Sequence, residues 1–190
     1  LLSFHDPESE LSLLNIHGRV RGSVDLRKLL TFSQAMWQRT EGAFNVAVAP
    51  ALIREGYLPL PHGKAFESGT AMDYVVGSSE ITLQRSVALD LGGVAKGYAV
   101  DQAIEILREY GLSSAIVIAG GDLRAYGELR DFFIRNPQNP QLLDSFGAGE
   151  DLALATSAGY FSDPESHGGY LPYVNKSHEC IRTMPSVMVA

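Results

Sequence analysis

The feature that most constrains the fold of this chain is a strand-like segment that runs into paired glycines and then into an amphipathic helix. Ser86–Leu91 is strand-like, and Gly92 and Gly93 interrupt it. The helix that follows has an apolar stripe at helical spacing, formed by Val100, Ala103, Ile104 and Leu107. Gly111 stands where a left-handed C-cap is needed, and Ala115–Ala119 is an apolar strand. This order predicts a domain in which helices and strands share one core.

Other segments extend the mixed pattern. Ser9 is a plausible N-cap for a short helix, and Val24–Arg39 is predicted as a longer helix that Ser23 or Asp25 would cap. Within Gly42–Pro50 a strand and a loop compete, and we favour a tight turn that leads into a packed extended segment. Further strands are predicted at Glu80–Gln84, 130–137, 152–157 and 185–190, and residues 59–77 form a loop-rich connection.

Length and composition limit the classes of protein to which the chain can belong. Its 190 residues fit one domain, which we expect to continue beyond both ends of this sequence. The net charge is −7 and the Lys and Arg residues are scattered, so we expect no nucleic-acid binding. No apolar run approaches the roughly 20 residues that span a bilayer. Cys180 is the single cysteine, which rules out an internal disulfide and favours a small buried side chain.

The paired glycines also favour phosphate binding. Gly92, Gly93 and Gly97 surround a helix start, where backbone N–H groups and the helix dipole attract anions, and Lys96 adds a cation. The alternative is a tight turn with Lys96 on the surface. The spacing matches neither a Walker loop nor a Gly-x-Gly-x-x-Gly crossover. Asp90 is expected either to accept hydrogen bonds from a ligand or to cap the turn.

Two later segments carry polar groups after apolar ones. In Ala119–Arg124 a strand runs into a double glycine, and we favour a structural ion pair between Asp122 and Arg124 over direct catalysis. Ala155–Gly159 is predicted as a hydroxyl-bearing turn that either meets phosphate or caps a helix. The five histidines lack zinc-site spacing, and no Gly-x-Ser-x-Gly elbow is present.

Taken in order, these motifs resemble those of one known family. Leu89–Asp101 (LDLGGVAKGYAVD), Ala119–Arg124 (AGGDLR) and the Ala-Thr-Ser of residues 155–157 resemble the ordered motifs of the ApbE family, the FAD:protein FMN transferases. Upstream, Asp6–Asn15 and Gly42–Val46 (GAFNV) are similar to the family's Pro-x-Ser-Glu and Gly-Ala-Phe-Asp-Val stretches. The likeness covers nearly the whole chain.

The resemblance implies a T-shaped α+β fold with FAD in a cleft between lobes. It implies a Mg²⁺-dependent reaction that moves FMN from FAD onto a Thr or Ser hydroxyl of an acceptor flavoprotein and leaves AMP. Lys96 would neutralise phosphate charge, Asp122 is one candidate base, and the Gly93 carbonyl would bind the metal. The implied FAD contacts are His5, Ala43, Phe44, Asn45, Asp90, Gly92, Lys96, Gly120, Gly121 and Thr156.

The chain also departs from the family pattern. Asn45 replaces an Asp, His5 stands where Tyr is common, and Leu171–Ser177 only partly matches a His-Ile-Ile-Asp-Pro-Arg-Thr-Gly stretch. The remaining metal ligands would follow Ala190. Two alternatives therefore stay open: an FAD-binding protein without turnover, and an FAD pyrophosphatase. Family members are often exported lipoproteins, so the resemblance suggests a periplasmic or inner-membrane-anchored location, with a lipid anchor outside this sequence.

Overall fold

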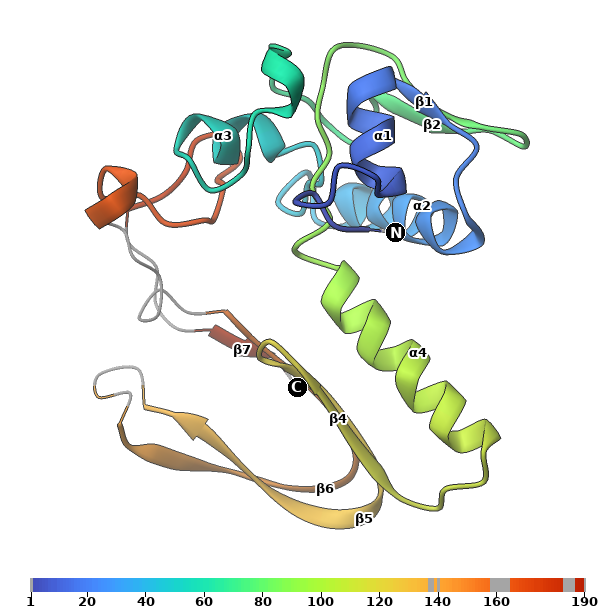
Figure 1. Cartoon of the computed structure of the whole chain (residues 1–190). Coiled ribbons are helices and arrows are strands. Elements are labelled where there is room, and N and C mark those ends of the chain that lie inside the picture. Colours follow the sequence, from blue (N-terminus) through green and yellow to red (C-terminus); the bar gives the residue numbers. More distant parts are fainter. Residues whose placement is uncertain (1, 137–138, 140, 158–164, 183–186, 190) are drawn as a thin grey trace. The chain divides into compact units, whose positions relative to one another are not determined.

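The chain forms two compact units: among the described residues, unit 1 contains several helices and a three-stranded sheet, and unit 2 contains one helix and a four-stranded sheet (Figure 1). The structure is a computed structural model that describes residues 2–136, 139, 141–157, 165–182 and 187–189. Unit 1 comprises Leu1–Ala95 and Asp163–Arg182, and unit 2 comprises Lys96–Ser162 and Thr183–Ala190. The mixed helix and sheet content confirms the predicted fold class. The expectation of a single domain stays a prediction.

The first two helices of unit 1 begin at the predicted caps. α1 spans Glu10–His17, and the Ser9 hydroxyl accepts a hydrogen bond from the Ser12 amide. α2 spans Val24–Arg39, and the Ser23 hydroxyl accepts one from the Leu26 amide. Each hydroxyl satisfies an amide that the helix itself leaves unpaired.

A small antiparallel sheet packs against these helices. Among the described residues its strands are β1 (Arg19–Val20), β3 (Ile81–Leu83) and β2 (Tyr74–Val76), in that spatial order. β3 confirms the predicted strand at 80–84, whereas β2 lies in the connection that the sequence left undefined. Buried Tyr74 donates its hydroxyl to the Leu30 carbonyl of α2 at 2.9 Å, which links this sheet to the helix.

The extended segment predicted within Gly42–Pro50 is wrong. Turns continue to Val48, and a short helix, α3 (Ala49–Arg54), then begins. Pro50 lies in the first helical turn, where its missing N–H removes no hydrogen bond. The small residues, which resemble a packed strand, bury one side of this helix instead. Short 3₁₀ helices η1 (Pro61–Gly63) and η2 (Glu165–His167) complete the described helical segments of unit 1.

The strand predicted at Ser86–Leu91 is also wrong, although its backbone is buried. Leu89 pairs with a side chain rather than a neighbouring strand: Asn15 Nδ2 donates to its carbonyl at 2.9 Å, and Asn15 Oδ1 accepts from its amide at 2.8 Å. The Asp90 amide donates to the Val46 carbonyl. Leu89 and Asn15 are fully buried, so both groups need these partners. Apolar composition alone cannot distinguish this segment from a strand.

Unit 2 confirms the predicted helix and, within the described residues, the predicted strands, whereas residues 137, 185, 186 and 190 of those strands lie outside the described part. Helix α4 spans Ala95–Glu109, beginning at the last residue of unit 1, and Gly111 follows it with a φ of +79°. The described strands form an antiparallel sheet in the order β4–β5–β6–β7 (Figure 1). Their bounds are β4 Ala115–Ala119, β5 Asp122–Arg135, β6 Leu143–Ser157 and β7 Val187–Val189. Ala125, Phe132 and Leu154 form a buried cluster on this sheet.

The hydroxyl-bearing turn predicted at Ala155–Gly159 is wrong for residues 155–157, which belong to β6. Thr156 pairs with Met188 of β7, and Ala155 pairs with both Asp122 and Val189. The backbone of these residues is therefore used in the sheet and caps no helix. Residues 158 and 159 lie outside the described part. No helix in that part is both long and apolar enough to cross a bilayer.

Candidate active site

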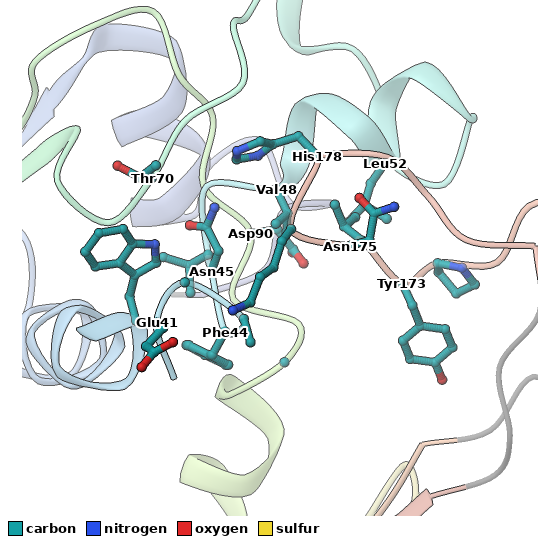
Figure 2. A pocket seen from close by; sticks show the side chains of 18 residues that line it. Glu41, Phe44, Asn45, Val48, Leu52, Thr70, Asp90, Tyr173, Asn175 and His178 are labelled. Atoms are coloured by element: carbon teal, nitrogen blue, oxygen red, sulfur yellow. The ribbon is translucent and has the colours of Figure 1, made fainter. Parts of the chain in front are cut away.

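A pocket of about 460 Å³ in unit 1 brings together two predicted segments that are distant in sequence. Residues 41–46, after α2, form one wall. Beside them lie Asp90 and Gly93, which belong to the bend at residues 90–93, called the glycine bend below. Residues 172–176 and His178 form another part of the lining. Figure 2 shows Asp90 between Phe44 and Asn45 on one side and Tyr173 and Asn175 on the other. Five predicted site residues thus line one cavity: Ala43, Phe44, Asn45, Asp90 and Gly93.

The side chain of Asn45 is held by two backbone groups. Its Nδ2 donates to the Gly69 carbonyl at 2.8 Å, and its Oδ1 accepts from the Ala47 amide at 3.0 Å. Only an amide can donate and accept in this way, because an ionised Asp has no donor. Asn45 therefore shapes the pocket wall by joining the turn after α2 to the segment at Gly69.

The glycine bend is closed by Asp90. Its Oδ2 accepts a hydrogen bond from the Gly92 amide at 3.2 Å, and a Cβ on Gly92 would lie 2.9 Å from the same oxygen. The Leu91 carbonyl accepts from the amides of Val94 and Ala95, which begins the helical turn. Asp90 thus caps the bend and also lines the pocket, so it fits both roles that the sequence left open.

A hairpin builds the wall at residues 171–181. The Leu171 amide donates to the Ile181 carbonyl, and the Ile181 amide donates to the Tyr173 carbonyl. Cys180, whose burial was predicted, packs against Ala51 and Leu52 of α3. Burial, and to a lesser extent the nearby Glu55 carboxylate, raise the pKa of its thiol. The partial family match at Leu171–Ser177 was the sequence signal for this wall, but it did not identify Lys176 or His178.

The predicted residues of unit 2 gather at one end of its sheet. Gly120 and Gly121 join β4 to β5 with φ values of +57° and +99°, as a two-residue hairpin turn requires. A Cβ on Gly120 would lie 3.4 Å from Lys96 Cδ, and one on Gly121 would lie 3.7 Å from the Thr156 carbonyl oxygen. Asp122 begins β5 beside them. Lys96 is exposed.

The ion pair proposed between Asp122 and Arg124 is wrong. Arg124 Nη1 instead contacts Asp101 Oδ1 of α4 at 2.9 Å, and its Nε lies 3.9 Å from Asp151 of β6. Asp122 and Arg124 are two residues apart on one strand, so their side chains leave the same face of the sheet in parallel and do not point toward each other. Asp101, on α4, offers Arg124 a nearer partner. Arg124 therefore joins the helix that carries Lys96 to the sheet.

His5 does not belong to the described lining of the unit 1 pocket. Its side chain is exposed, and its backbone amide donates to the Ser3 hydroxyl at 3.2 Å. Within the described ranges, no three His, Cys, Asp or Glu side chains gather in a way that could hold a metal ion. The Gly93 carbonyl and the roles of the other predicted residues stay predictions.

Comparison with known proteins now decides the family. A sequence model of the ApbE family matches residues 1–167. The chain belongs to the ApbE family. It is 28% identical over 146 residues to the FAD:protein FMN transferase of Haemophilus influenzae, covering 67% of this chain and 42% of that protein. It is 27% identical over 187 residues to the FAD:protein FMN transferase of Vibrio cholerae, covering 88% and 56% respectively.

Solved ApbE structures share the fold. The ApbE protein of Thermotoga maritima superposes with a TM-score of 0.83 at 25% identity, covering 98% of this chain and 67% of that one. The flavinyl transferase ApbE of Pseudomonas stutzeri superposes with a TM-score of 0.77 at 20% identity, covering 98% and 64%. These matches confirm the α+β ApbE class. The chain spans about half the length of the two curated relatives named above.

Proposed function

We propose that this chain carries the FAD-binding part of an FAD:protein FMN transferase. One observation carries the proposal. The resemblance to the family implies that residues 43–45 and the glycine bend at 90–93 bind FAD and its metal ion, and both segments line a single pocket. Family membership and the relatives' names support the same activity. The pocket combines aromatic walls with a few polar groups, which is typical of small-molecule sites.

The proposed reaction exchanges one P–O bond for another. A Thr or Ser hydroxyl oxygen of an acceptor protein attacks the flavin-side phosphorus of FAD. The bond from that phosphorus to the bridging oxygen breaks, the bridging oxygen leaves with AMP, and the hydroxyl proton passes to a base. Such a transfer depends on positioning and on neutralising negative charge.

Three features of the chain would serve these needs. Lys96 would neutralise phosphate charge, and the amide of exposed Gly93 would donate to a phosphate oxygen. Asp122, at the start of β5, is the candidate proton acceptor within this chain.

The proposed cofactor ion is Mg²⁺. Gly93 and Asp90 line the pocket and offer a carbonyl and a carboxylate oxygen, which are donors that Mg²⁺ prefers. Mg²⁺ commonly fills the rest of its coordination shell with water and substrate phosphates, so a small protein donor set suits it. When bound, the ion would neutralise charge on the leaving phosphate.

The test is incubation of the protein with FAD, Mg²⁺ and an acceptor peptide that contains Thr or Ser. We expect AMP and a flavin-labelled peptide in equal amounts, measured by chromatography and mass spectrometry. AMP with free FMN and no labelled peptide would identify a pyrophosphatase instead. FAD recovered unchanged from a tight complex would identify a binding protein without turnover.

The location proposed from the family is the periplasmic side of the inner membrane, with a lipid anchor outside this sequence. Fractionation of the source cells, followed by immunodetection, tests it. Recovery of the protein with cytosolic markers would contradict the proposal.

A further inference from the structure

The pocket in unit 1 contains an unbalanced set of charges. Two of its described lining residues, Glu41 and Asp90, carry carboxylates. Lys176 is the sole lysine or arginine among the lining residues that the structure describes, and His178 follows two positions later. A dinucleotide brings at least two further negative charges, in a protein whose net charge is already −7. An anionic ligand in this pocket therefore needs a local cation.

The tip of the hairpin, residues 175–179, bears Lys176 and is shaped by its own hydrogen bonds. Asn175 Oδ1 accepts from the amides of Ser177 at 2.9 Å and Glu179 at 3.1 Å. The Asn175 amide donates to the Glu179 carbonyl, and the His178 amide donates back to the Asn175 carbonyl. The Asn175 side chain is thus committed to the turn. Its neighbour Lys176 lines the pocket, and its side chain is not part of these hydrogen bonds.

The tip is also fixed to the rest of unit 1. Arg54 Nη2 donates to the His178 carbonyl at 3.3 Å, and the Tyr57 hydroxyl donates to the Tyr170 carbonyl at 2.6 Å. Buried Cys180 packs on α3 at the base of the tip. A lysine on such an anchored turn loses less freedom when it binds than one on an unsupported loop.

Lys176 itself forms no ion pair with any described residue, and its side chain is exposed. Its ammonium group, with three donors, is free to meet an anion. We propose that Lys176 binds a phosphate group of the flavin nucleotide and makes this pocket select phosphorylated flavins over riboflavin. This inference rests on the proposed function and assigns a cation of its own to the hairpin of unit 1.

The experiment compares FAD, FMN and uncharged riboflavin as probes, titrated against the full chain by flavin fluorescence. We expect Lys176→Ala to weaken FAD and FMN binding about tenfold and to change riboflavin binding less than about twofold. Lys176→Arg should bind FAD within about threefold of the wild type, because it keeps the charge. Added salt should weaken FAD binding less in Lys176→Ala than in the wild type.

Two control variants separate the role of this lysine from general effects. Ser177→Ala changes the adjacent side chain of the tip, and Lys28→Ala removes an exposed lysine of α2 that does not line the pocket. Both should bind FAD as the wild type does. Unchanged FAD binding in Lys176→Ala would overturn the proposal. An equal loss for all three flavins would do so too, because it would indicate a role in pocket shape.

The outcomes also distinguish this inference from the proposed function. Lys176-dependent FAD binding without AMP release would support the lysine's role and contradict the transferase. AMP release by the wild type, with Lys176→Ala binding unchanged, would overturn this inference alone. A wild-type protein that binds none of the three flavins would overturn both.

Discussion

At the scale of single residues, Asn45 shows how a departure from the family pattern is built into the fold. Its amide donates to the Gly69 carbonyl and accepts from the Ala47 amide, and both contacts are partly buried. A carboxylate at this position would face a carbonyl oxygen without a proton between them. The Asn is therefore matched to its local surroundings.

We predict that Asn45→Asp lowers the free energy of unfolding by about 1–3 kcal/mol at neutral pH. The carbonyl next to the new carboxyl should raise its folded-state pKa above the unfolded value. The loss of unfolding free energy then reaches its full size at pH values above the folded-state pKa. It disappears as the pH falls below the unfolded-state pKa of about 4, because the protonated acid can donate to the carbonyl. Urea unfolding across pH 3–8 measures this. Gln38→Glu, on an exposed site of α2, is the control, and a penalty independent of pH would contradict the explanation.

Lys96 is the residue on which the proposed chemistry depends most. Its side chain is exposed and approaches Gly120, so its removal should not disturb a core. We predict that Lys96→Ala lowers the rate of AMP release about 10²- to 10³-fold, while the free energy of unfolding changes by less than about 0.5 kcal/mol. Rate assays and urea unfolding together test this. Full activity in the variant would contradict the assigned role.

The environment of Asp73 predicts how the stability of the protein changes at low pH. Burial raises the pKa of its carboxyl, but hydrogen bonds from Arg85 and Thr70 lower it more, so the net pKa lies below the ordinary 3.8. A lowered folded-state pKa adds stability above the unfolded pKa, and this is lost as the pH falls through the folded value. Hence the stability difference between wild type and Arg85→Gln should be constant above about pH 5 and shrink below about pH 4.

Urea unfolding of both proteins between pH 2.5 and 7 measures that difference. Arg39→Gln, which removes an exposed arginine of α2, should show no such trend. Arg85 also donates to the Ser68 carbonyl, which does not titrate, so a part of the difference should remain at pH 2.5. A difference that does not shrink between pH 5 and pH 2.5 would contradict the assignment to Asp73.

At the scale of elements, β5 depends on a close approach at Gly127. This residue has a φ of +92°, and a Cβ there would lie 2.0 Å from the Ser113 carbonyl oxygen and 2.8 Å from Ser114 Cα. Both neighbours are backbone atoms, so no side chain can move aside. The loop that leads from α4 into β4 can lie against β5 only because this side chain is absent.

We predict that Gly127→Ala destabilises the protein by at least about 3 kcal/mol, because it adds a clash to an unfavourable backbone conformation. Gly97→Ala is the matched control: it lies in α4, has an ordinary φ and would meet nothing within 4 Å. That control should be neutral or stabilise by up to about 1 kcal/mol. Thermal and urea unfolding compare the two, and similar stabilities would contradict the argument.

The sequence predicts elements well where local signals agree. α1 and α2 begin at serine caps, α4 has an apolar stripe and a glycine beyond its end, and all three occur as predicted. The prediction fails where contacts with distant segments decide which element forms. Ser86–Leu91 resembles a strand but pairs with Asn15. For Ala155–Ser157 the sequence predicts both a strand and a turn, and the pairing with β7 decides for the strand. Neither partner is visible in the local sequence.

The candidate site follows the same rule. Gly42–Asn45 and the glycine bend were identified through ordered motifs, and they line one pocket. Lys176 and the Asp101–Arg124 pair were missed because each depends on a contact between distant segments. No spacing within either segment reports such a contact.

At the scale of the whole molecule, the two compact units raise the question of cooperativity. Trp37, the single tryptophan, and Cys180, the single cysteine, both belong to unit 1, whereas circular dichroism reports on helices and strands of both. Two-state unfolding requires all probes to change together.

We predict that tryptophan fluorescence, circular dichroism and the reaction of Cys180 with a thiol reagent give one urea midpoint. Burial and the raised pKa of the Cys180 thiol should keep it unreactive in the native state. Coincident curves would support a single cooperative domain. A circular dichroism transition at a separate urea concentration would show that the units unfold independently.

The pairing of Asn15 with Leu89 links residues 74 positions apart. Contacts between such distant residues form late in folding, because closing the intervening chain carries an entropic cost. While the polypeptide is still being made, the Asn15 side chain of α1 therefore lacks this partner until Leu89 has been synthesised. Since Asp90 and residues 172–176 line the same pocket as the early segment 41–46, that pocket should be among the last features of unit 1 to mature.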